Sequence, residues 1–297
     1  MTDFFPGFET RRIATRETEI HCVTGGSGPP LLLLHGYPQT HVMWHRAAPM
    51  LAQHFTVVAA DLRGYGDSGK PGSDDSHAAY SKRVMAGDLA EVMSSLGFDR
   101  FFVAAHDRGA RVAHRMALDF PDRIDRLATL DIVPTHYRFG SVNKDVATRG
   151  YHWFFLIQPA PFPETLIGGS TAYFLNHTLD SWSETPGVPE PEARADYLRC
   201  LSDPEMIHAT CEDYRAAATI DLEHDEADFR AGNRVRCPML VLWGAASVQG
   251  STYDMTTVWR NYADDVRGRP VDCGHFIAEE APGETAETLS AFFSERI

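Results

Sequence analysis

The sequence lacks the features that place a protein in a membrane or outside the cell. No run of about 18 apolar residues occurs, the length expected of a transmembrane helix. The amino-terminal segment MTDFFPGFETRR has no apolar stretch typical of a secretion signal. The five cysteines are scattered, odd in number and without CxxC spacing. They predict free thiols in a reducing cytoplasm, with neither disulfides nor a zinc site.

Basic residues are also scarce. The chain has 27 Lys and Arg against 41 Asp and Glu, a formal net charge of −14, and no basic run. This balance argues against nucleic acid and anionic membranes as partners. A small anion can still bind where a few cations converge.

What the sequence does contain is typical of one globular domain, or of a core with an insert, at 297 residues and 43% hydrophobic content. Short apolar runs alternate with helical patterns, and each run is short enough for a strand buried on both faces. The runs are Leu31–Leu34, Thr56–Ala60, Phe101–Ala105, Leu127–Leu130 and Met239–Trp243. Apolar residues at helical spacing follow within 85–96, 112–117 and 289–293. The alternation predicts an α/β fold with a mostly parallel sheet flanked by helices.

This alternation stops between about Thr135 and Asn233, where aromatic, proline and glutamate residues are frequent. We expect a helical cap inserted over the carboxyl edge of the sheet, where ligands of such sheets bind. The predicted domains are a core formed by 1–134 and 234–297, with the cap at 135–233.

The most specific motif is Ala105-His106-Asp107-Arg108-Gly109, between a predicted strand and a predicted helix. It has the small–x–nucleophile–x–small form of a nucleophile elbow. Small residues are needed because the turn is sharp, and the turn raises Asp107 above the sheet. There the backbone N–H groups of the helix start favour an anion. The alternative is that Asp107 only caps the helix, which aspartate commonly does.

Other segments favour the elbow. His35-Gly36-Tyr37-Pro38 follows the first run, so the backbone N–H groups of Tyr37 and Arg108 are expected to form an oxyanion hole. A glycine-rich turn at 61–68 follows the next run. His275, in Gly274-His275-Phe276, lies late in the chain, where an α/β-hydrolase has its general base. Imidazole suits that role because its pKa is near neutrality.

The acid that orients His275 is expected to be Asp131. The segment 243–250, after the strand that follows the cap, contains no carboxylate. Asp131 instead ends the run Leu127–Leu130, where an unpaired carboxylate is costly to bury. The alternative is a turn residue or a structural ion pair.

Together these residues resemble one group, the fluoroacetate or haloacetate dehalogenases of the α/β-hydrolase superfamily. Matching motifs run along nearly the whole chain, among them LLLLHGYPQTHVMW, ADLRGYGDSGKP, HDRGARVAHRMALD, LDIVPT, YHWFFLIQPAP, CEDYRAAATIDLEHD and CGHF. Many relatives have glycine where this chain has Ala105, a small change. The resemblance implies that Asp107 is the nucleophile, His275 the base and Asp131 its partner. It also implies a homodimer.

By the same resemblance, Arg108 and Arg111 hold the substrate carboxylate, and His152, Trp153 and Tyr214 hold the halide. Two arginines spaced i, i+3 on the first turn of a helix can bind a carboxylate through charge-assisted bonds. The alternatives are that either arginine pairs with a cap carboxylate, and that the aromatic side chains only pack within the cap.

The residues therefore predict hydrolysis of short 2-haloacids, with fluoroacetate or chloroacetate giving glycolate and halide through an aspartyl ester. A carboxylate suits attack at saturated carbon because water can hydrolyse the ester that it forms. No metal or organic cofactor is predicted, because nucleophile, base and anion donors are all supplied by the chain. The alternatives are an epoxide hydrolase, with Tyr214 as an acid over the epoxide, and a noncatalytic binding protein of the same fold.

Overall fold

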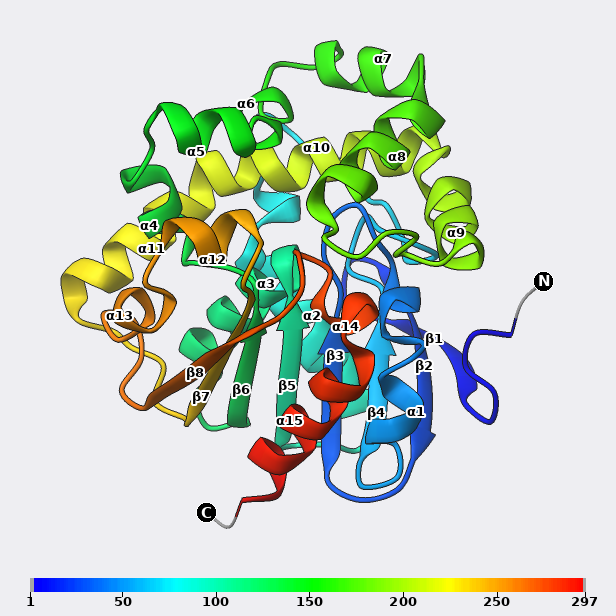
Figure 1. Cartoon of the computed structure of the whole chain (residues 1–297), viewed down its shortest axis with the longest axis vertical. Coiled ribbons are helices and arrows are strands. Elements are labelled where there is room, and N and C mark those ends of the chain that lie inside the picture. The colour runs from blue at the N-terminus through cyan, green and yellow to red at the C-terminus, as the bar shows by residue number, and fades with distance from the viewer. Residues whose placement is uncertain (1–2, 296–297) are drawn as a thin grey trace.

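Figure 1 shows a computed structural model of the chain, in which residues 3–295 are described. An eight-stranded sheet forms the centre, in the order β1-β2-β4-β3-β5-β6-β7-β8. The strands are β1 (Glu9–Ala14), β2 (Glu19–Gly26), β3 (Pro30–Leu34), β4 (Thr56–Ala60), β5 (Phe101–His106), β6 (Ile124–Leu130), β7 (Met239–Gly244) and β8 (Val266–Val271). The α/β fold and the five strands predicted from apolar runs are confirmed.

The sheet is parallel from β4 to β8, whereas β2 runs antiparallel to both β4 and β1. Edge strands β1 and β8 have mostly exposed or half-exposed side chains. Apolar runs did not predict them, because an edge strand needs little apolar surface to pair with its neighbour. Strand β2 was not predicted either, since His21, Thr24 and two glycines interrupt its apolar residues.

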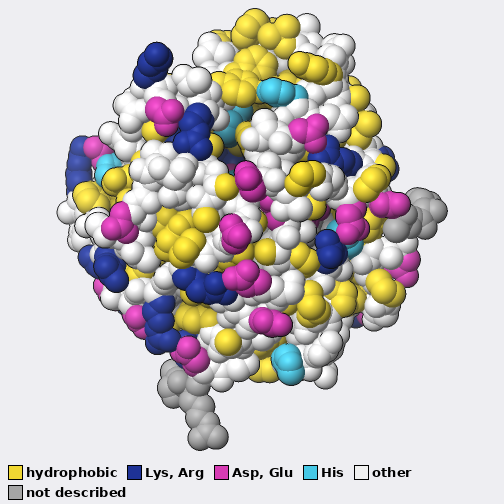
Figure 2. Space-filling view, in the orientation of Figure 1, with side chains coloured by type: hydrophobic (Ala, Val, Ile, Leu, Met, Phe, Trp, Pro, Cys, Tyr) yellow, Lys and Arg dark blue, Asp and Glu magenta, His cyan; other side chains and the backbone are white. Residues whose placement is uncertain are grey.

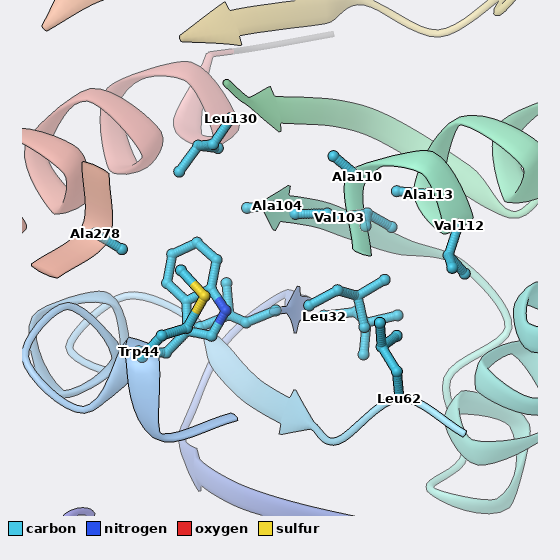
Figure 3. Close-up of a cluster of buried hydrophobic side chains, with 14 of the residues drawn as sticks. Leu32, Trp44, Leu62, Val103, Ala104, Ala110, Val112, Ala113, Leu130 and Ala278 are labelled. Carbon is cyan, nitrogen blue, oxygen red and sulfur yellow. The ribbon is translucent and has the colours of Figure 1, made fainter. Parts of the chain in front are cut away.

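Helices of the core cover both faces of the sheet, as Figure 1 shows for α1 and α15 in front and α2 and α3 behind. They are η1 (His41–Trp44), α1 (Ala48–Leu51), η2 (Ala78–Tyr80), α2 (Lys82–Ser95), α3 (Asp107–Asp119), α12 (Val248–Thr252), α13 (Met255–Trp259), α14 (Ile277–Glu280) and α15 (Pro282–Ser294). Helix α3 packs close to the sheet because small side chains face it: Figure 3 shows Ala110 and Ala113 beside Leu32 and Val103.

Between β6 and β7 the chain forms only helices, which lie above the sheet in Figure 1. They are α4 (Thr135–Gly140), α5 (Lys144–Arg149), α6 (His152–Phe155), α7 (Phe162–Gly168), α8 (Thr171–Trp182), α9 (Pro191–Leu201), α10 (Pro204–Ala218) and α11 (Ile220–Ala231). We call this layer the cap. Within residues 3–295, no helix is long and apolar enough to cross a bilayer.

Candidate active site

Asp107 lies at the bend between β5 and α3, with a backbone φ of +43°. This left-handed conformation is strained for a residue with a side chain, and such strain is common at functional sites. The bend depends on glycine: a side chain at Gly109 would collide with the carbonyl oxygen of His35, and one at Gly36 with Asp107 itself. The local geometry is therefore that of a nucleophile elbow.

The Asp107 carboxylate is held by the neighbouring loop and not by its own helix. The backbone N–H of Tyr37 donates to Oδ1 of Asp107 at 2.9 Å, and no side-chain bond caps α3. Among the described residues, the structure thus gives Asp107 no capping role. Burial alone would raise the pKa of Asp107, but His275, His106, Arg108 and Arg111 together leave it lowered from 3.8. The group is ionised at neutral pH.

His275, in the loop between β8 and α14, faces Asp107 from one side and Asp131 from the other. Its Nδ1 lies 2.6 Å from Oδ2 of Asp131, and its Nε2 lies 4.0 Å from Oδ2 of Asp107. Burial lowers the pKa of His275, but the hydrogen bond and charge of Asp131 reverse this and raise the pKa above 6.5. The separation from Asp107 is too long for a hydrogen bond.

Asp131 follows β6 directly, with a φ of +54°. Its Oδ1 accepts hydrogen bonds from the Ser247 hydroxyl at 2.7 Å and the Gly244 backbone N–H at 3.1 Å. One carboxylate oxygen is thus fixed by the loop after β7, and the other is left for His275. Ser247 was missed from the sequence because the search of that loop was for a carboxylate, not for a donor to one.

The two arginines expected at the substrate carboxylate, Arg108 and Arg111, have different surroundings. Arg108 is fully buried and donates to Oδ2 of Asp213 at 2.8 Å, so it pairs with a cap carboxylate. Only its Nη1 is buried without a partner. Arg111 donates through Nη1 to the Val133 carbonyl and the Thr135 hydroxyl, while its Nε and Nη2 are buried without partners. Arg111 therefore has the larger unused capacity to bind an anion.

Asp213 is a further residue of this region that the sequence did not single out. It is fully buried on α10, and it also accepts from Lys82 of α2 and from the Tyr65 hydroxyl. Burial raises its pKa, but Arg108 and Lys82 outweigh burial and hold the pKa well below 3.8. The sequence did contain a signal for Asp213: an aspartate next to Tyr214, on a helix whose buried residues are mostly apolar. These contacts of Asp213 join helix α10 of the cap to the core.

The three residues expected at the halide lie together in the cap. The ring centroids of Trp153 and Tyr214 are 5.4 Å apart, and those of His152 and Tyr214 are 5.8 Å apart. The Tyr214 hydroxyl and the His152 Nδ1 are buried without partners. Burial lowers the pKa of His152 to about 3, so its imidazole is neutral at physiological pH. The arginines of α3 lie over these rings, Arg108 at 4.0 Å from Tyr214 and Arg111 at 4.5 Å from Trp153.

A cavity of about 360 Å³ opens above Asp107 and His275, between core and cap. His152 and Trp153 line it, whereas Arg108, Arg111 and Tyr214 are not among the residues that line it. Its other lining residues are Asp131, Arg138, Thr148, Arg149, Gly150, Tyr151, His177, Ser181, Trp182, Ala246, Ser247, Val248 and Gln249. Trp182, which the sequence analysis did not single out, packs at 5.3 Å from His275 and 4.5 Å from His152.

A separate group has metal-ligand composition: His21, His41 and Asp61, whose ligand atoms lie within 4.8 Å of one another. Both oxygens of Asp61 are already used. Oδ1 accepts from His41, and Oδ2 accepts from the backbone N–H of Asp67 and faces His21 Nδ1 at 3.0 Å. This arrangement is a hydrogen-bond network that fixes the loop after β4.

Comparison with known proteins places these features in context. The family described as alpha/beta hydrolase fold matches residues 29–282. A fluoroacetate dehalogenase from Burkholderia sp is 47% identical, with 98% of this chain and 95% of that protein covered. A soluble epoxide hydrolase from Corynebacterium sp. (strain C12) is 36% identical, with 93% of each covered. The crystal structure of ALR0039 from Nostoc sp PCC 7120 is 55% identical, with a TM-score of 0.95, and covers 97% of this chain and 99% of that chain.

These similarities extend through the strands, the elbow and the cap. The family match alone spans 29–282, from the first residue before β3 to the start of α15. The chain belongs to the α/β-hydrolase family, in the branch that also contains the Burkholderia fluoroacetate dehalogenase.

Proposed function

We propose that the protein is a hydrolytic dehalogenase of short 2-haloacids, converting fluoroacetate or chloroacetate to glycolate and halide. The observation that carries this proposal is the state of the Asp107 carboxylate. One oxygen is held by the Tyr37 N–H, and the other lies beside His275 without bonding to it. Arg111 has unpaired guanidinium N–H groups and lies over the ring of Trp153, which lines the cavity above Asp107. The chemistry of the Burkholderia relative agrees with this assignment.

In the first step, Oδ2 of Asp107 attacks the carbon that carries the halogen. A C–O bond forms, the carbon–halogen bond breaks, and the halide leaves with the bonding electrons. Oδ2 is assigned because Oδ1 already accepts the Tyr37 N–H. Attack from the back inverts the configuration at a chiral carbon. The lowered pKa keeps the nucleophile ionised without help from a base.

In the second step, His275 takes a proton from water, and the resulting hydroxide attacks Cγ of the Asp107 ester. The negative charge that develops on Oδ1 faces the backbone N–H groups of Tyr37 and Arg108, the proposed oxyanion hole. The tetrahedral intermediate then collapses, glycolate leaves with a proton from His275, and Asp107 is regenerated. Asp131 orients the imidazole and stabilises its protonated form.

Substrate recognition follows from the unused donors. Arg111 Nε and Nη2 and Arg108 Nη1 have no partners in the described chain and suit a carboxylate. The Tyr214 hydroxyl and the neutral His152 and Trp153 rings suit a departing halide, which becomes a stronger acceptor as charge moves onto it. A haloalkane without a carboxylate would leave the guanidinium groups of α3 unused.

An epoxide hydrolase is the second candidate function, because Tyr214 has a free buried hydroxyl and an epoxide hydrolase from Corynebacterium is 36% identical. A phenol can donate a proton to an opening epoxide. The unpaired donors of Arg111 favour the haloacid, since an epoxide carries no anion to bind them.

The test is a small substrate panel. Halide release is measured from fluoroacetate, chloroacetate and bromoacetate, and diol formation from styrene oxide and epichlorohydrin, for the wild type and for Asp107→Ala. We expect halide release that Asp107→Ala abolishes. Diol formation without halide release would assign the epoxide reaction. Halide release by Asp107→Ala at the wild-type rate would refute the assignment of Asp107 as the nucleophile.

We further propose a three-part organisation, 1–134 and 234–297 as core and 135–233 as cap, although residues 1–2 and 296–297 lie outside the described part.

We also propose a homodimer in the cytoplasm. Free thiols at all five cysteines support a reducing compartment. Large exposed apolar side chains on α7 and α8, at the top of Figure 2, support self-association: Phe162, Leu166 and Tyr173. Sedimentation analysis of the wild type and of Tyr173→Glu tests the dimer.

A further inference from the structure

Arg138 is a buried arginine that faces the active-site cavity without an acidic partner. It lies on α4, at the start of the cap, and is only 2% exposed. It lines the same cavity as Asp107, His152 and His275. Its guanidinium donates only to neutral oxygens, the Tyr253 hydroxyl at 3.2 Å and the Val146 carbonyl at 3.4 Å.

This lack of a counter-ion is unusual within the protein. The other buried arginines, apart from Arg111, each lie within 4.0 Å of a carboxylate: Arg63, Arg108, Arg115, Arg126 and Arg215. A buried charge without a partner is costly. Of the two exceptions, Arg138 lines the active-site cavity, and Arg111 lies over the ring of Trp153, which lines it too. Arg111 is already assigned to the carboxylate next to the reacting carbon, which leaves Arg138 without an anion.

The chain makes room for this guanidinium. Gly150 packs against it, and a side chain at that position would collide with Nη2 of Arg138. Gly150 lines the cavity as well. The site is therefore shaped around a cation that nothing in the described chain neutralises.

We propose that Arg138 binds a second carboxylate of the substrate, so that the enzyme accepts 2-halodicarboxylic acids such as 2-chlorosuccinate. This inference rests on the proposed dehalogenase function and names a further substrate class for the same chamber. The carboxylate next to the halogen binds at Arg111 and Arg108, and the distal carboxylate binds at Arg138.

The spacing of the two arginines fits a short diacid. Both guanidinium groups lie over Trp153, Arg111 at 4.5 Å and Arg138 at 5.8 Å from its ring centroid. Their central carbons are thus at most about 10 Å apart, because the 4.5 Å and 5.8 Å lines meet at one ring. A four-carbon diacid can bridge such a gap when each end accepts N–H···O bonds of about 2.8 Å.

The cavity also exceeds the needs of a haloacetate. Its volume of about 360 Å³ is within the range of pockets for larger ligands. Arg149 lines it too, but that side chain is 35% exposed and has Asp145 at 3.7 Å, so solvent and a carboxylate already compensate its charge. Arg138 is the cation with both burial and unmet charge.

The test compares 2-chlorosuccinate with 2-chlorobutyrate, which has the same chain length and an uncharged end. We expect wild-type kcat/KM to favour the diacid by at least about tenfold, and Arg138→Met to reduce this preference about 10- to 100-fold. Arg138→Lys should keep part of the preference. Equal losses for both substrates in Arg138→Met, or no preference in the wild type, would overturn the proposal.

Arg149→Met is the matched control, since it removes an arginine from the same cavity. A comparable loss of preference there would indicate general attraction at the cavity mouth and would refute a discrete site. Binding is measured separately by the thermal shift that succinate and butyrate produce. Succinate should stabilise the wild type more than butyrate does, and Arg138→Met should remove the difference. The thermal shift tests the Arg138 site even when no halide is released. Absence of halide release would refute the dehalogenase function but not the Arg138 site.

Discussion

Nε2 of His275 lies 4.0 Å from Oδ2 of Asp107, near the proposed nucleophile but not bonded to it. The catalytic chemistry depends on this gap. A hydrogen bond would hold the carboxylate oxygen that has to attack, whereas at 4.0 Å this oxygen is free of His275, and the imidazole is still close enough to the proposed ester to activate a water molecule beside it. The predictions below begin from that arrangement.

Isotope labelling distinguishes the ester route from direct attack by water. In a single turnover in heavy-oxygen water, we expect the label in the Asp107 carboxylate and unlabelled oxygen in the glycolate, because the product takes Oδ2. Mass spectrometry of the peptide that contains Asp107 and of the glycolate measures both. Label found directly in the glycolate would exclude the covalent intermediate.

His275→Asn should stop the reaction at the ester, because the first step needs no base. We expect the Asp107 peptide to gain the mass of a carboxymethyl group after incubation with chloroacetate, with turnover reduced at least about 10³-fold. His136→Asn, which alters a half-buried histidine bonded to Tyr262, is the control and should accumulate no adduct. Absence of the adduct in His275→Asn would contradict the assigned role.

The pH dependence of kcat should follow the ionisation of His275. The base must be neutral to accept a proton from water, and its pKa is raised above 6.5. Activity should therefore fall as the pH drops through that raised pKa, while Asp107 stays ionised because its own pKa is lowered. Asp131→Asn removes the largest raising influence, so the inflection should move to lower pH while kcat falls about 10⁴-fold. Halide release at saturating chloroacetate, from about pH 5 to about pH 9, measures this. An unchanged inflection in Asp131→Asn would refute the coupling.

Arg111 and Arg108 should respond differently to removal. Arg111→Met removes unpaired donors, so KM for chloroacetate should rise about 10- to 100-fold with the free energy of unfolding lowered by about 1 kcal/mol at most. Arg108→Met leaves Asp213 with only Lys82 as a cation in contact, so that free energy should fall by about 3 kcal/mol. Urea unfolding and steady-state kinetics report the two effects. Similar stability losses in both variants would contradict the difference in pairing.

Tyr214→Phe should impair fluoride release more than bromide release. The phenol is buried without a partner, and fluoride needs a hydrogen-bond donor more than bromide because it is the poorer leaving group. We expect kcat for fluoroacetate to fall about tenfold more than kcat for bromoacetate. Tyr80→Phe, which removes a buried hydroxyl bonded to the Pro71 carbonyl away from the proposed halide site, serves as the control. Equal losses for both substrates would assign Tyr214 to packing.

Several features of this protein could be predicted from the sequence because their causes are local. Runs such as Leu31–Leu34 are strands because consecutive apolar residues require burial on both faces of a sheet. The elbow at Asp107 could be recognised because a sharp turn restricts its neighbours to small residues, as the space around Gly109 illustrates. These constraints act between residues a few positions apart.

The partners of buried charges could not be predicted in the same way. Arg108 pairs with Asp213, which is 105 residues away, and Asp131 accepts from Ser247, which is 116 residues away. Sequence spacing contains no information on such contacts, which depend on how the cap closes over the sheet. The tertiary structure alone decided that Arg111 and Arg138 remain without carboxylates, because burial brings charges together or isolates them only after the chain has folded.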